Sequence, residues 1–380
     1  MAKVAILGHG VVGSGTAEVL MMNAEGIAKR AGEPVEVKYI LDIREFPDLP
    51  YADRFTKDIE VILNDPEVEV VAEVIGGLKP AYDFVSRCLK SGKSVVTSNK
   101  ELVAAKGAEL LQTAKEHGVL FLFEASVGGG IPIIRPLAQC LAANEVERVT
   151  GILNGTTNYI LTRMFHQQQP FDVALRSAQE LGYAEADPTA DVEGIDACRK
   201  ICILASLAFG RHVYPQYVHA EGISKLSAAD VEMAAKEDRV IKLLGIARKG
   251  EDGTVFAMVA PFAISRSHLL AGVEDVFNGI VVKGNAVDEV AFVGRGAGKL
   301  PTASAVVADI IDCVKHRGGE NMMKWTDCAE NIVRNWEDER FRRLVRLAGE
   351  AEHRVTEPMT EAEFAAAFAG KTVESALRML

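Results

Sequence analysis

The segment Gly8-His9-Gly10-Val11-Val12-Gly13 decides the fold, because it is a G-x-G-x-x-G motif between a predicted strand, residues 3–7, and a predicted helix, residues 14–28. The glycines permit a tight turn and let backbone N–H groups approach a pyrophosphate, which then lies at the positive end of the helix. Glycine-rich turns are common, so the motif is informative only in this setting. Its predicted contacts with a dinucleotide are Gly8, Gly10, Val11, Val12 and Gly13.

Strand-like and helix-like segments alternate through the first third of the chain. Further strands are predicted at residues 35–41, 68–74, 94–97 and 119–123, and helices at 81–91 and 108–116. Mostly apolar strands separated by helices are typical of a parallel sheet that is covered on both faces. The sequence therefore predicts an α/β fold with a Rossmann-type doubly wound parallel sheet.

The pattern changes after residue 130. Longer helices are predicted at residues 174–181, 197–209 and 230–247, and strands at 255–259 and 279–282. This mixture predicts a second domain of the α+β class.

Composition narrows the classes of partner. The 380 residues are 48% hydrophobic and 25% charged, with a formal net charge of −11. An acidic chain is a poor match for nucleic acid or an anionic membrane surface, both of which attract clustered Lys and Arg, so small molecules are the predicted ligands. Met1 leads directly into an apolar strand, and no apolar run approaches the ~18 residues of a membrane span. We therefore expect a cytoplasmic protein.

The six cysteines are scattered along the chain, which argues against a disulfide framework. Cys198 and Cys202 are four residues apart, but no second Cys or His pair stands nearby at the spacing of a zinc site. Packed thiols are the favoured interpretation, and the sequence predicts no transition-metal site.

The residue after the second strand bears on the choice of cofactor. Asp42 stands where an acid hydrogen-bonds the adenosine ribose of NAD, and its charge would repel the 2′-phosphate of NADP. Arg44, two residues later, could accommodate that phosphate. The distance from Gly13 to Asp42 also requires an insertion around residues 23–34. NAD or NADP is therefore expected, with a preference for NAD.

A second polar site is predicted where a loop leads into a helix. Four carboxylates precede a lysine there, in the order Glu185, Asp187, Asp191, Asp196 and Lys200. Because an apolar run follows it, Lys200 begins a segment that should be buried, and an unpaired buried ammonium is strongly disfavoured. Asp196 lies on the same helical face as Lys200. A solvated helical ion pair and a catalytic pair are both compatible with this spacing.

Six motifs that follow one another in this order resemble homoserine dehydrogenase. They are residues 73–77 (EVIGG), 95–100 (VVTSNK), 123–132 (FEASVGGGIP), 151–159 (GILNGTTNY), 185–200 and 294–305 (GRGAGKLPTASA). The similarity extends from residue 3 to about residue 311. It implies NAD(P)-dependent interconversion of L-homoserine and L-aspartate 4-semialdehyde, on the route to threonine, methionine and isoleucine.

The resemblance also implies the catalytic residues. By family position Lys200 is the proton donor and acceptor, Lys100 polarises the same oxygen and contacts the cofactor, and Asp196 holds Lys200 in place. Two ammonium groups at one site would lower each other's pKa, which suits proton transfer near neutral pH. The alternative for Lys100 is an exposed loop lysine.

The amino-acid substrate is expected to meet groups of the second domain. The resemblance assigns its amino end to Glu185 and Asp191, because carboxylates suit an ammonium. Asp187, which precedes a proline, is also typical of a turn cap. Asn154, Gly155 and Thr156 are expected to contact substrate or nicotinamide, although Asn-Gly-Thr is also an ordinary turn sequence.

A monovalent cation, usually sodium, is implied by the same resemblance. Its expected ligands are the main-chain carbonyls of Glu124, Val127, Gly129 and Ile131. The three glycines at 128–130 are consistent with a loop that points carbonyls inward, and equally with an interdomain hinge. The cofactor contacts are expected to be completed by Gly296, Ala297, Gly298 and Thr302, before a helix at residues 302–316.

The expected domains are residues 1–130 for the dinucleotide, completed by 294–325, and residues 131–293 for substrate binding and dimerisation. A homodimer is expected through the second domain's sheet, around residues 255–264 and 279–282. Residues 326–380 form a C-terminal extension that is too short for the complete regulatory ACT domain of many relatives. Residues 340–347 resemble the first strand of that domain and the remainder predicts a helix, which leaves control by threonine open.

Two alternatives stay open on the sequence alone. One is a dehydrogenase that acts on another amino-acid aldehyde or on an amine, which substrate tests by absorbance at 340 nm would separate. The other is a non-catalytic dinucleotide sensor. The presence of Lys100, Asp196 and Lys200 together argues against a sensor.

Overall fold

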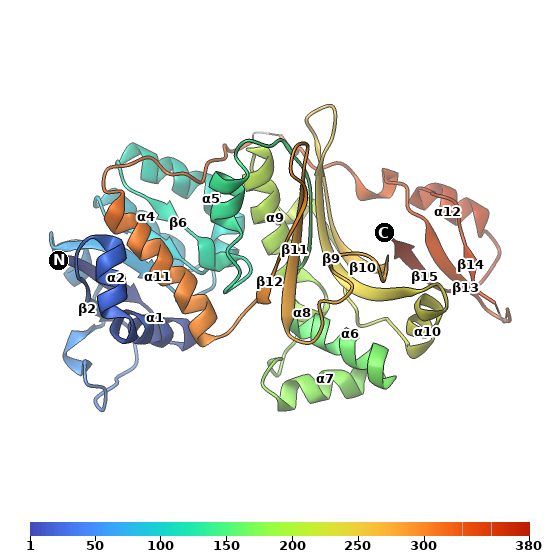
Figure 1. Ribbon diagram of the computed structural model, residues 1–380, viewed down its shortest axis with the longest axis horizontal. Coiled ribbons are helices and arrows are strands. Elements are labelled where there is room, and N and C mark those ends of the chain that lie inside the picture. The colour runs from blue at the N-terminus through green and yellow to red at the C-terminus, as the bar shows by residue number, and fades with distance from the viewer. Residues whose placement is uncertain (329, 351) are drawn as a thin grey trace. The chain divides into compact units, whose positions relative to one another are not determined.

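The computed structural model describes residues 1–328, 330–350 and 352–380, which form two compact units. The first unit comprises Met1–Ala143, Ser206–His212 and the described residues from 295 to 328. The second comprises Asn144–Ala205, Val213–Gly294 and the described residues from 330 to 380. Figure 1 labels many of their helices and strands. Within the described residues, every helix is too short or too polar to cross a membrane.

A six-stranded parallel sheet forms the centre of the first unit, in the order β3-β2-β1-β4-β5-β6. Its strands are β1 (Ala2–Leu7), β2 (Val35–Leu41), β3 (Phe55–Thr56), β4 (Val68–Glu73), β5 (Ser94–Thr97) and β6 (Phe121–Leu122). The side chains of β1 and β4 are almost all buried, as expected for strands covered on both faces, and the predicted doubly wound sheet is confirmed. The strand order reverses between β1 and β4, and such sheets bind ligands at the carboxyl ends of the strands at this point.

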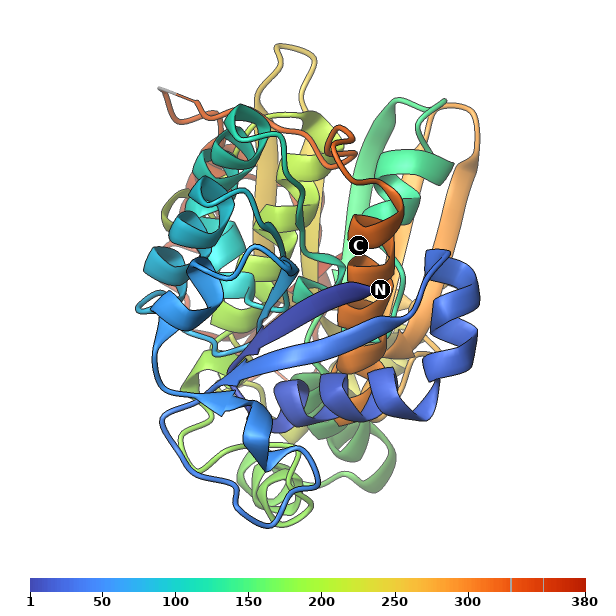
Figure 2. The same cartoon turned by 90° about the vertical axis from the view of Figure 1, so that its left-hand side faces the viewer.

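The helices of this unit are α1 (Val11–Met22), α2 (Ala24–Ala31), α3 (Ile59–Leu63), α4 (Ala81–Lys90), α5 (Lys100–Glu116) and α11 (Lys299–Lys315). The helix predicted at residues 14–28 is divided at Asn23, whose φ of −110° and ψ of 20° lie outside the helical region. The second part, α2, accounts for the extra residues between Gly13 and Asp42. α11, dark orange in Figure 2, packs against α1 and α2, in blue.

A nine-stranded sheet forms the centre of the second unit, in the order β12-β11-β7-β9-β10-β15-β13-β14, with β8 paired to β10. Its strands are β7 (Val146–Ile152), β8 (His219–Ala220), β9 (Arg239–Lys249), β10 (Val255–Ser265), β11 (Phe277–Gly284), β12 (Asp288–Arg295), β13 (Arg343–Leu347), β14 (Arg354–Val355) and β15 (Val373–Met379). The accompanying helices are α6 (Gly155–Gln167), α7 (Phe171–Glu180), α8 (Thr189–Val192), α9 (Ile195–Phe209), α10 (Ala228–Lys236) and α12 (Glu361–Ala367). The last four residues of α9 are counted with the first unit.

The helix predicted at residues 230–247 is wrong in its second half. α10 ends at Lys236, Asp238 adopts a φ of 53°, and β9 begins at Arg239. The run that follows has no polar face because both faces of β9 are covered. Burying a Leu or Ile side chain is worth about 1.5–3 kcal/mol, which favours a central strand over a half-exposed helix here.

The C-terminal extension also differs from its prediction. Residues 343–347 form a strand, β13, but the helix expected up to the C-terminus covers only α12. The last element is β15, which pairs in parallel with β10 through Phe262 and Ala263 and antiparallel with β13. The extension therefore continues the sheet of the second unit.

The segment predicted to form the dimer surface, residues 255–264, is buried within a single chain. β10 is hydrogen-bonded to β9 on one edge and to β8 and β15 on the other. Its hydrophobic side chains, for example Met258 and Phe262, are fully buried, so β10 presents little exposed surface. β12, at the end of the sheet, exposes 56% of Val293.

The buried side chain of Lys242 predicts how the stability of the fold depends on pH. Its ammonium is buried in β9, where it donates to the Val273 carbonyl at 2.6 Å and to Asn158 Oδ1 at 3.2 Å. Burial lowers its pKa from 10.5 to about 8. Between these two values only the unfolded chain holds the proton, so the free energy of unfolding should rise with pH from 8 to 10.5, by about 1–3 kcal/mol.

We expect Lys242→Met to abolish the rise in the free energy of unfolding with pH. Lys236→Met, at an exposed position of α10, should retain this rise. The comparison is made by urea unfolding of the three proteins at pH 7.5 and pH 10. Equal pH dependence in all three would show that Lys242 titrates normally in the folded chain.

Candidate active site

The G-x-G-x-x-G segment forms the turn between β1 and α1. Gly8 adopts a φ of 98°, and a Cβ on Gly13 would lie 1.9 Å from the Gly8 carbonyl oxygen, so both positions require glycine. A Cβ on Gly10 would meet no described atom within 4 Å. Gly10 is the N-cap of α1, where its lack of a side chain leaves the first turn of the helix uncapped. The N–H groups of this turn and its positive dipole end suit a pyrophosphate.

Asp42 follows β2 and is bonded to the glycine turn. Its carboxylate accepts the N–H groups of His9, at 2.7 Å, and Arg44, at 2.9 Å. The Arg44 guanidinium adds two hydrogen bonds, from Nε to Oδ1 at 3.0 Å and from Nη2 to Oδ2 at 2.9 Å. The Arg44 side chain, together with these N–H groups, holds the pKa of Asp42 well below its ordinary value. The two residues predicted to act in opposite directions on cofactor choice are therefore bound to each other.

Glu73, which the sequence showed only as part of a motif, shapes the turn after β4. Its fully buried carboxylate accepts the N–H of Ile75 at 2.8 Å and the hydroxyl of Thr97 at 2.7 Å. Burial raises the pKa of Glu73. An acidic residue at the end of an apolar strand was the signal that could have identified it.

Lys100 is the first residue of α5 and not a loop residue. Asn99 caps this helix, because its Oδ1 accepts the Leu102 N–H at 3.0 Å, and its Nδ2 donates to the Gly77 carbonyl at 2.6 Å. The cap therefore ties the start of α5 to the turn after β4. A lysine is unfavourable in the first turn of a helix, since it faces the positive dipole end, which favours a functional reason for this residue.

Lys200 and Asp196 form a buried ion pair on α9. Lys200 is 7% exposed and Asp196 3%, so the alternative of a solvated surface pair is wrong. The Lys200 Nζ donates to Asp196 Oδ2 and to the Leu153 carbonyl, each at 2.7 Å. The ammonium is thereby held in one place, as a positioned proton donor must be.

Asn154 connects this pair to a further carboxylate. Its Nδ2 donates to Asp191 Oδ1 at 2.7 Å and to Asp196 Oδ2 at 2.9 Å. Asn154 is also the N-cap of α6, where its Oδ1 accepts the Thr157 N–H at 2.9 Å. The second unit thus brings together Asn154, at the N-cap of α6, with Asp191 of α8 and with Asp196 and Lys200 of α9.

The other predicted substrate residues have different surroundings. The Thr156 hydroxyl donates to the Tyr183 carbonyl at 2.6 Å, and a Cβ on Gly155 would lie 2.7 Å from the Val276 carbonyl oxygen. The Glu185 side chain is exposed. Asp187 caps a turn, as its alternative predicts, because its Oδ1 accepts the N–H and hydroxyl of Thr189.

The predicted cation ligands Glu124, Val127, Gly129 and Ile131 lie in one buried loop of the first unit. Gly128 and Gly129 adopt φ values of 76° and 54°, and a Cβ on Gly129 would lie 2.5 Å from the Gly296 carbonyl oxygen. Buried carbonyl groups outside regular structure require partners, and a cation is a suitable one. No group of three His, Cys, Asp or Glu side chains among the described residues could hold a metal, so the fit rests on main-chain oxygens.

Comparisons with known proteins identify the family. A model of the homoserine dehydrogenase NAD-binding domain matches residues 8–124, and a homoserine dehydrogenase model matches residues 132–311. The chain belongs to the homoserine dehydrogenase family. A homoserine dehydrogenase of Synechocystis is 47% identical over 319 residues, which are 82% of this chain and 73% of that protein.

Solved structures of homoserine dehydrogenases share the fold. The enzyme from Thiobacillus denitrificans superposes with a TM-score of 0.90 at 36% identity and covers 100% of this chain and 98% of its own. A hyperthermophilic archaeal homoserine dehydrogenase in complex with NADPH has a TM-score of 0.70 at 28% identity, over 82% of this chain and 97% of its own. The resemblance to homoserine dehydrogenase that the sequence motifs indicate is confirmed, and the chain is an oxidoreductase with an NAD-binding domain.

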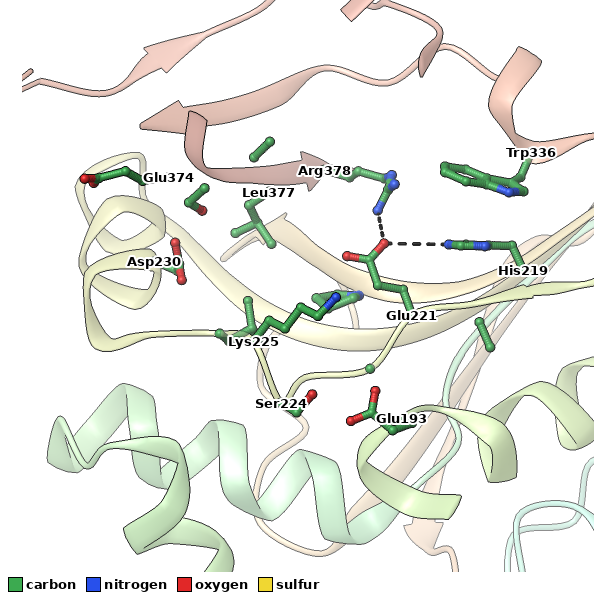
Figure 3. A pocket seen from close by; sticks show the side chains of 16 residues that line it. Glu193, His219, Glu221, Ser224, Lys225, Asp230, Trp336, Glu374, Leu377 and Arg378 are labelled. Atoms are coloured by element: carbon green, nitrogen blue, oxygen red, sulfur yellow. Dashed lines mark hydrogen bonds and ion pairs between the residues drawn. The ribbon is translucent and has the colours of Figure 1, made fainter. Parts of the chain in front are cut away.

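The second unit also contains a cavity of about 470 Å³ that includes none of the predicted site residues. Glu221 in its wall accepts a hydrogen bond from Arg378 at 2.6 Å and lies 3.8 Å from His219 (Figure 3). Burial alone would raise the pKa of Glu221, but His219 and Arg378 lower it to about 2. Arg378 belongs to β15, so the C-terminal extension forms part of this cavity.

Proposed function

We propose that this chain interconverts L-homoserine and L-aspartate 4-semialdehyde with a nicotinamide cofactor, in the biosynthesis of threonine, methionine and isoleucine. The observation that carries the proposal is the buried Lys200–Asp196 pair, joined by Asn154 to Asp191. The amine can move a proton, while the neighbouring carboxylate suits the ammonium of an amino-acid substrate. Family membership supplies the substrate.

Bound NAD or NADP supplies or accepts the hydride at the substrate's terminal carbon. During reduction Lys200 donates a proton from Nζ to the carbonyl oxygen, and during oxidation it takes the proton back. Asp196 keeps Nζ in place and stabilises its charged form. Asp191 and Glu185 hold the substrate's ammonium, Asn154, Gly155 and Thr156 line the substrate's position, and Lys100 polarises the reacting oxygen.

The dinucleotide is proposed to lie along the first unit. Its pyrophosphate meets Gly8, Gly10, Val11, Val12 and Gly13, and its remaining contacts are Asp42, Arg44, Lys100, Gly296, Ala297, Gly298 and Thr302. The open space beside Gly10 at the start of α1, and the bond between Asp42 and the glycine turn, support this proposal. A monovalent cation, sodium in the first instance, is proposed at the carbonyls of Glu124, Val127, Gly129 and Ile131.

We propose that NAD is used at least as well as NADP. The Arg44 guanidinium is bound to Asp42, and Lys57 pairs with Glu45 at 2.8 Å, so two cations that could meet a 2′-phosphate are already neutralised. The archaeal neighbour was solved with NADPH. The choice between NAD and NADP in this chain is therefore proposed to depend on Asp42.

We expect Asp42→Ala to raise the ratio of kcat/KM for NADP over NAD by about tenfold, because a carboxylate–hydroxyl bond is worth about 1.5–3 kcal/mol and is replaced by repulsion with NADP. Asp48→Ala removes a charge from an exposed position of the same loop and should leave the ratio within about threefold. Steady-state kinetics with both cofactors make the comparison. A parent enzyme that prefers NADP by tenfold or more would show that Arg44 or Lys57 governs the pocket.

A homodimer is also proposed, formed through residues 131–293. Because β10 is buried within one chain, the dimer surface is proposed to come from other strands of the sheet, and β12 is the most exposed of those that precede the C-terminal extension. Multi-angle light scattering at micromolar concentration should give twice the chain mass of 41.0 kDa. A mass near 41.0 kDa would contradict the dimer.

A further inference from the structure

The carboxylate of Glu124 closes the loop in which the cation is proposed to bind. Its Oε1 accepts the N–H groups of Ile133 at 2.7 Å and Ile134 at 2.9 Å, and its Oε2 accepts the N–H of Arg135 at 2.8 Å. The side chain is 1% exposed. One end of the loop is therefore bonded to the other through a single side chain, which uses both carboxylate oxygens.

Asp309 fixes the same loop to α11. Its Oδ2 accepts the backbone N–H of Glu124 at 2.8 Å, and its Oδ1 is paired with the Arg135 guanidinium. The Arg135 Nε lies 2.7 Å from Asp312 Oδ2, one turn further along α11. Asp309 is fully buried, whereas the Asp312 side chain is 20% exposed. Both ends of the loop, at Glu124 and at Arg135, are thus tied to one helix.

The middle of the loop lies against the backbone of residues 295 and 296. The Gly130 N–H donates to the Arg295 carbonyl at 3.0 Å, and Gly129 packs against the backbone of Gly296. Glycines lose more conformational freedom on ordering than other residues, so three in succession make a fixed arrangement of carbonyl oxygens costly unless the ends of the loop are restrained. A binding site loses affinity when its ligand groups must be ordered during binding.

We propose that the side chains of Glu124 and Asp309 are positioning residues, which hold the loop from Glu124 to Ile131 in the shape that its carbonyls need to bind a monovalent cation. The inference rests on the proposed cation site. The carboxylates act through the backbone and do not themselves coordinate the ion.

Glu124→Gln tests this inference. The carboxylate accepts backbone N–H groups with both of its oxygens, whereas the amide of glutamine has only one acceptor oxygen. Asp309→Asn is the second variant, since its amide nitrogen would meet the Arg135 guanidinium. Asp312→Asn is the matched control, because Asp312 pairs with the Arg135 guanidinium, whereas Asp309 pairs with it and also accepts the backbone N–H of Glu124. The thermal midpoint of the full chain is followed as NaCl replaces choline chloride at constant ionic strength.

In the parent protein we expect the midpoint to rise saturably with NaCl. The sodium concentration at half-saturation should increase at least tenfold in Glu124→Gln and in Asp309→Asn, and change less than twofold in Asp312→Asn. If Glu124→Gln does not fold, the sodium dependence of Asp309→Asn alone tests the inference. Half-saturation at the parental concentration in the folded variants would overturn the inference.

A parent protein whose thermal midpoint responds equally to NaCl and choline chloride would rule out the cation site, and with it the positioning role of Glu124 and Asp309. Dehydrogenase activity measured in both salts separates this outcome from a failure of the proposed reaction. Activity without a sodium response would leave the proton-transfer role of Lys200 standing.

Discussion

Replacing Lys200 by Ala should lower kcat by about 10²- to 10⁴-fold, which is the usual contribution of a positioned general acid or base. The dissociation constant for NADH should stay within about threefold of the parent value, because the glycine turn lies in the first unit and Lys200 in the second. Single-turnover rates and fluorescence titration with NADH measure the two quantities separately.

The exposed lysine Lys236 provides the control, since Lys236→Ala removes an ammonium from the same unit without disturbing a buried pair. Lys200→Ala also leaves the Asp196 carboxylate without its cation, so a thermal midpoint must be recorded for each variant. A folded Lys200→Ala enzyme with activity within about threefold of the parent would remove this residue from the mechanism.

Replacing Gly10 by Ala should weaken dinucleotide binding by about 10- to 100-fold while leaving the fold intact. Its Cβ would touch no described protein atom, so the substitution has no steric reason to destabilise the chain. The same Cβ would occupy the space in front of the α1 N-terminus, where the pyrophosphate is proposed to lie. Titration with NADH tests the expected loss of affinity. A thermal midpoint measured without cofactor tests whether the fold is intact.

Gly26→Ala is the matched control, because Gly26 lies within α2 and a Cβ there would meet only the end of the flexible Arg30 side chain, at 3.1 Å. Alanine in a helix is about 1 kcal/mol more favourable than glycine, so this variant should be as stable as the parent or more so, with unchanged affinity. Equal affinity in Gly10→Ala would place the pyrophosphate elsewhere.

Local signals in the sequence predicted the first unit well. The predicted strands at residues 35–41 and 94–97 coincide with β2 and β5, because short apolar runs between turns leave little choice of element. The run after Asp238 was misread as helix, since a strand buried on both faces has no alternation to distinguish it from a buried helix. β15 was missed because its pairing with β10 joins residues more than a hundred positions apart.

Some contacts of the candidate site could likewise be predicted from local sequence, and others could not. The spacing of Asp196 and Lys200 along one helix predicted their pairing, and the burial that makes the pair chemically useful follows from the apolar run beside it. The bonds of Glu124 to Asp309, and of Asn154 to Asp191 and Asp196, join segments brought together only by the fold. Periodicity carries no information about such contacts.

Absorbance at 340 nm during incubation with L-homoserine tests the central claim most directly. With NAD or NADP in excess, the parent enzyme should reduce the cofactor at a rate that depends on L-homoserine and falls by the expected factor in Lys200→Ala. L-serine and L-threonine should support much slower reduction. The absence of homoserine-dependent reduction with either cofactor, or faster reaction with another amino alcohol, would contradict the proposed function.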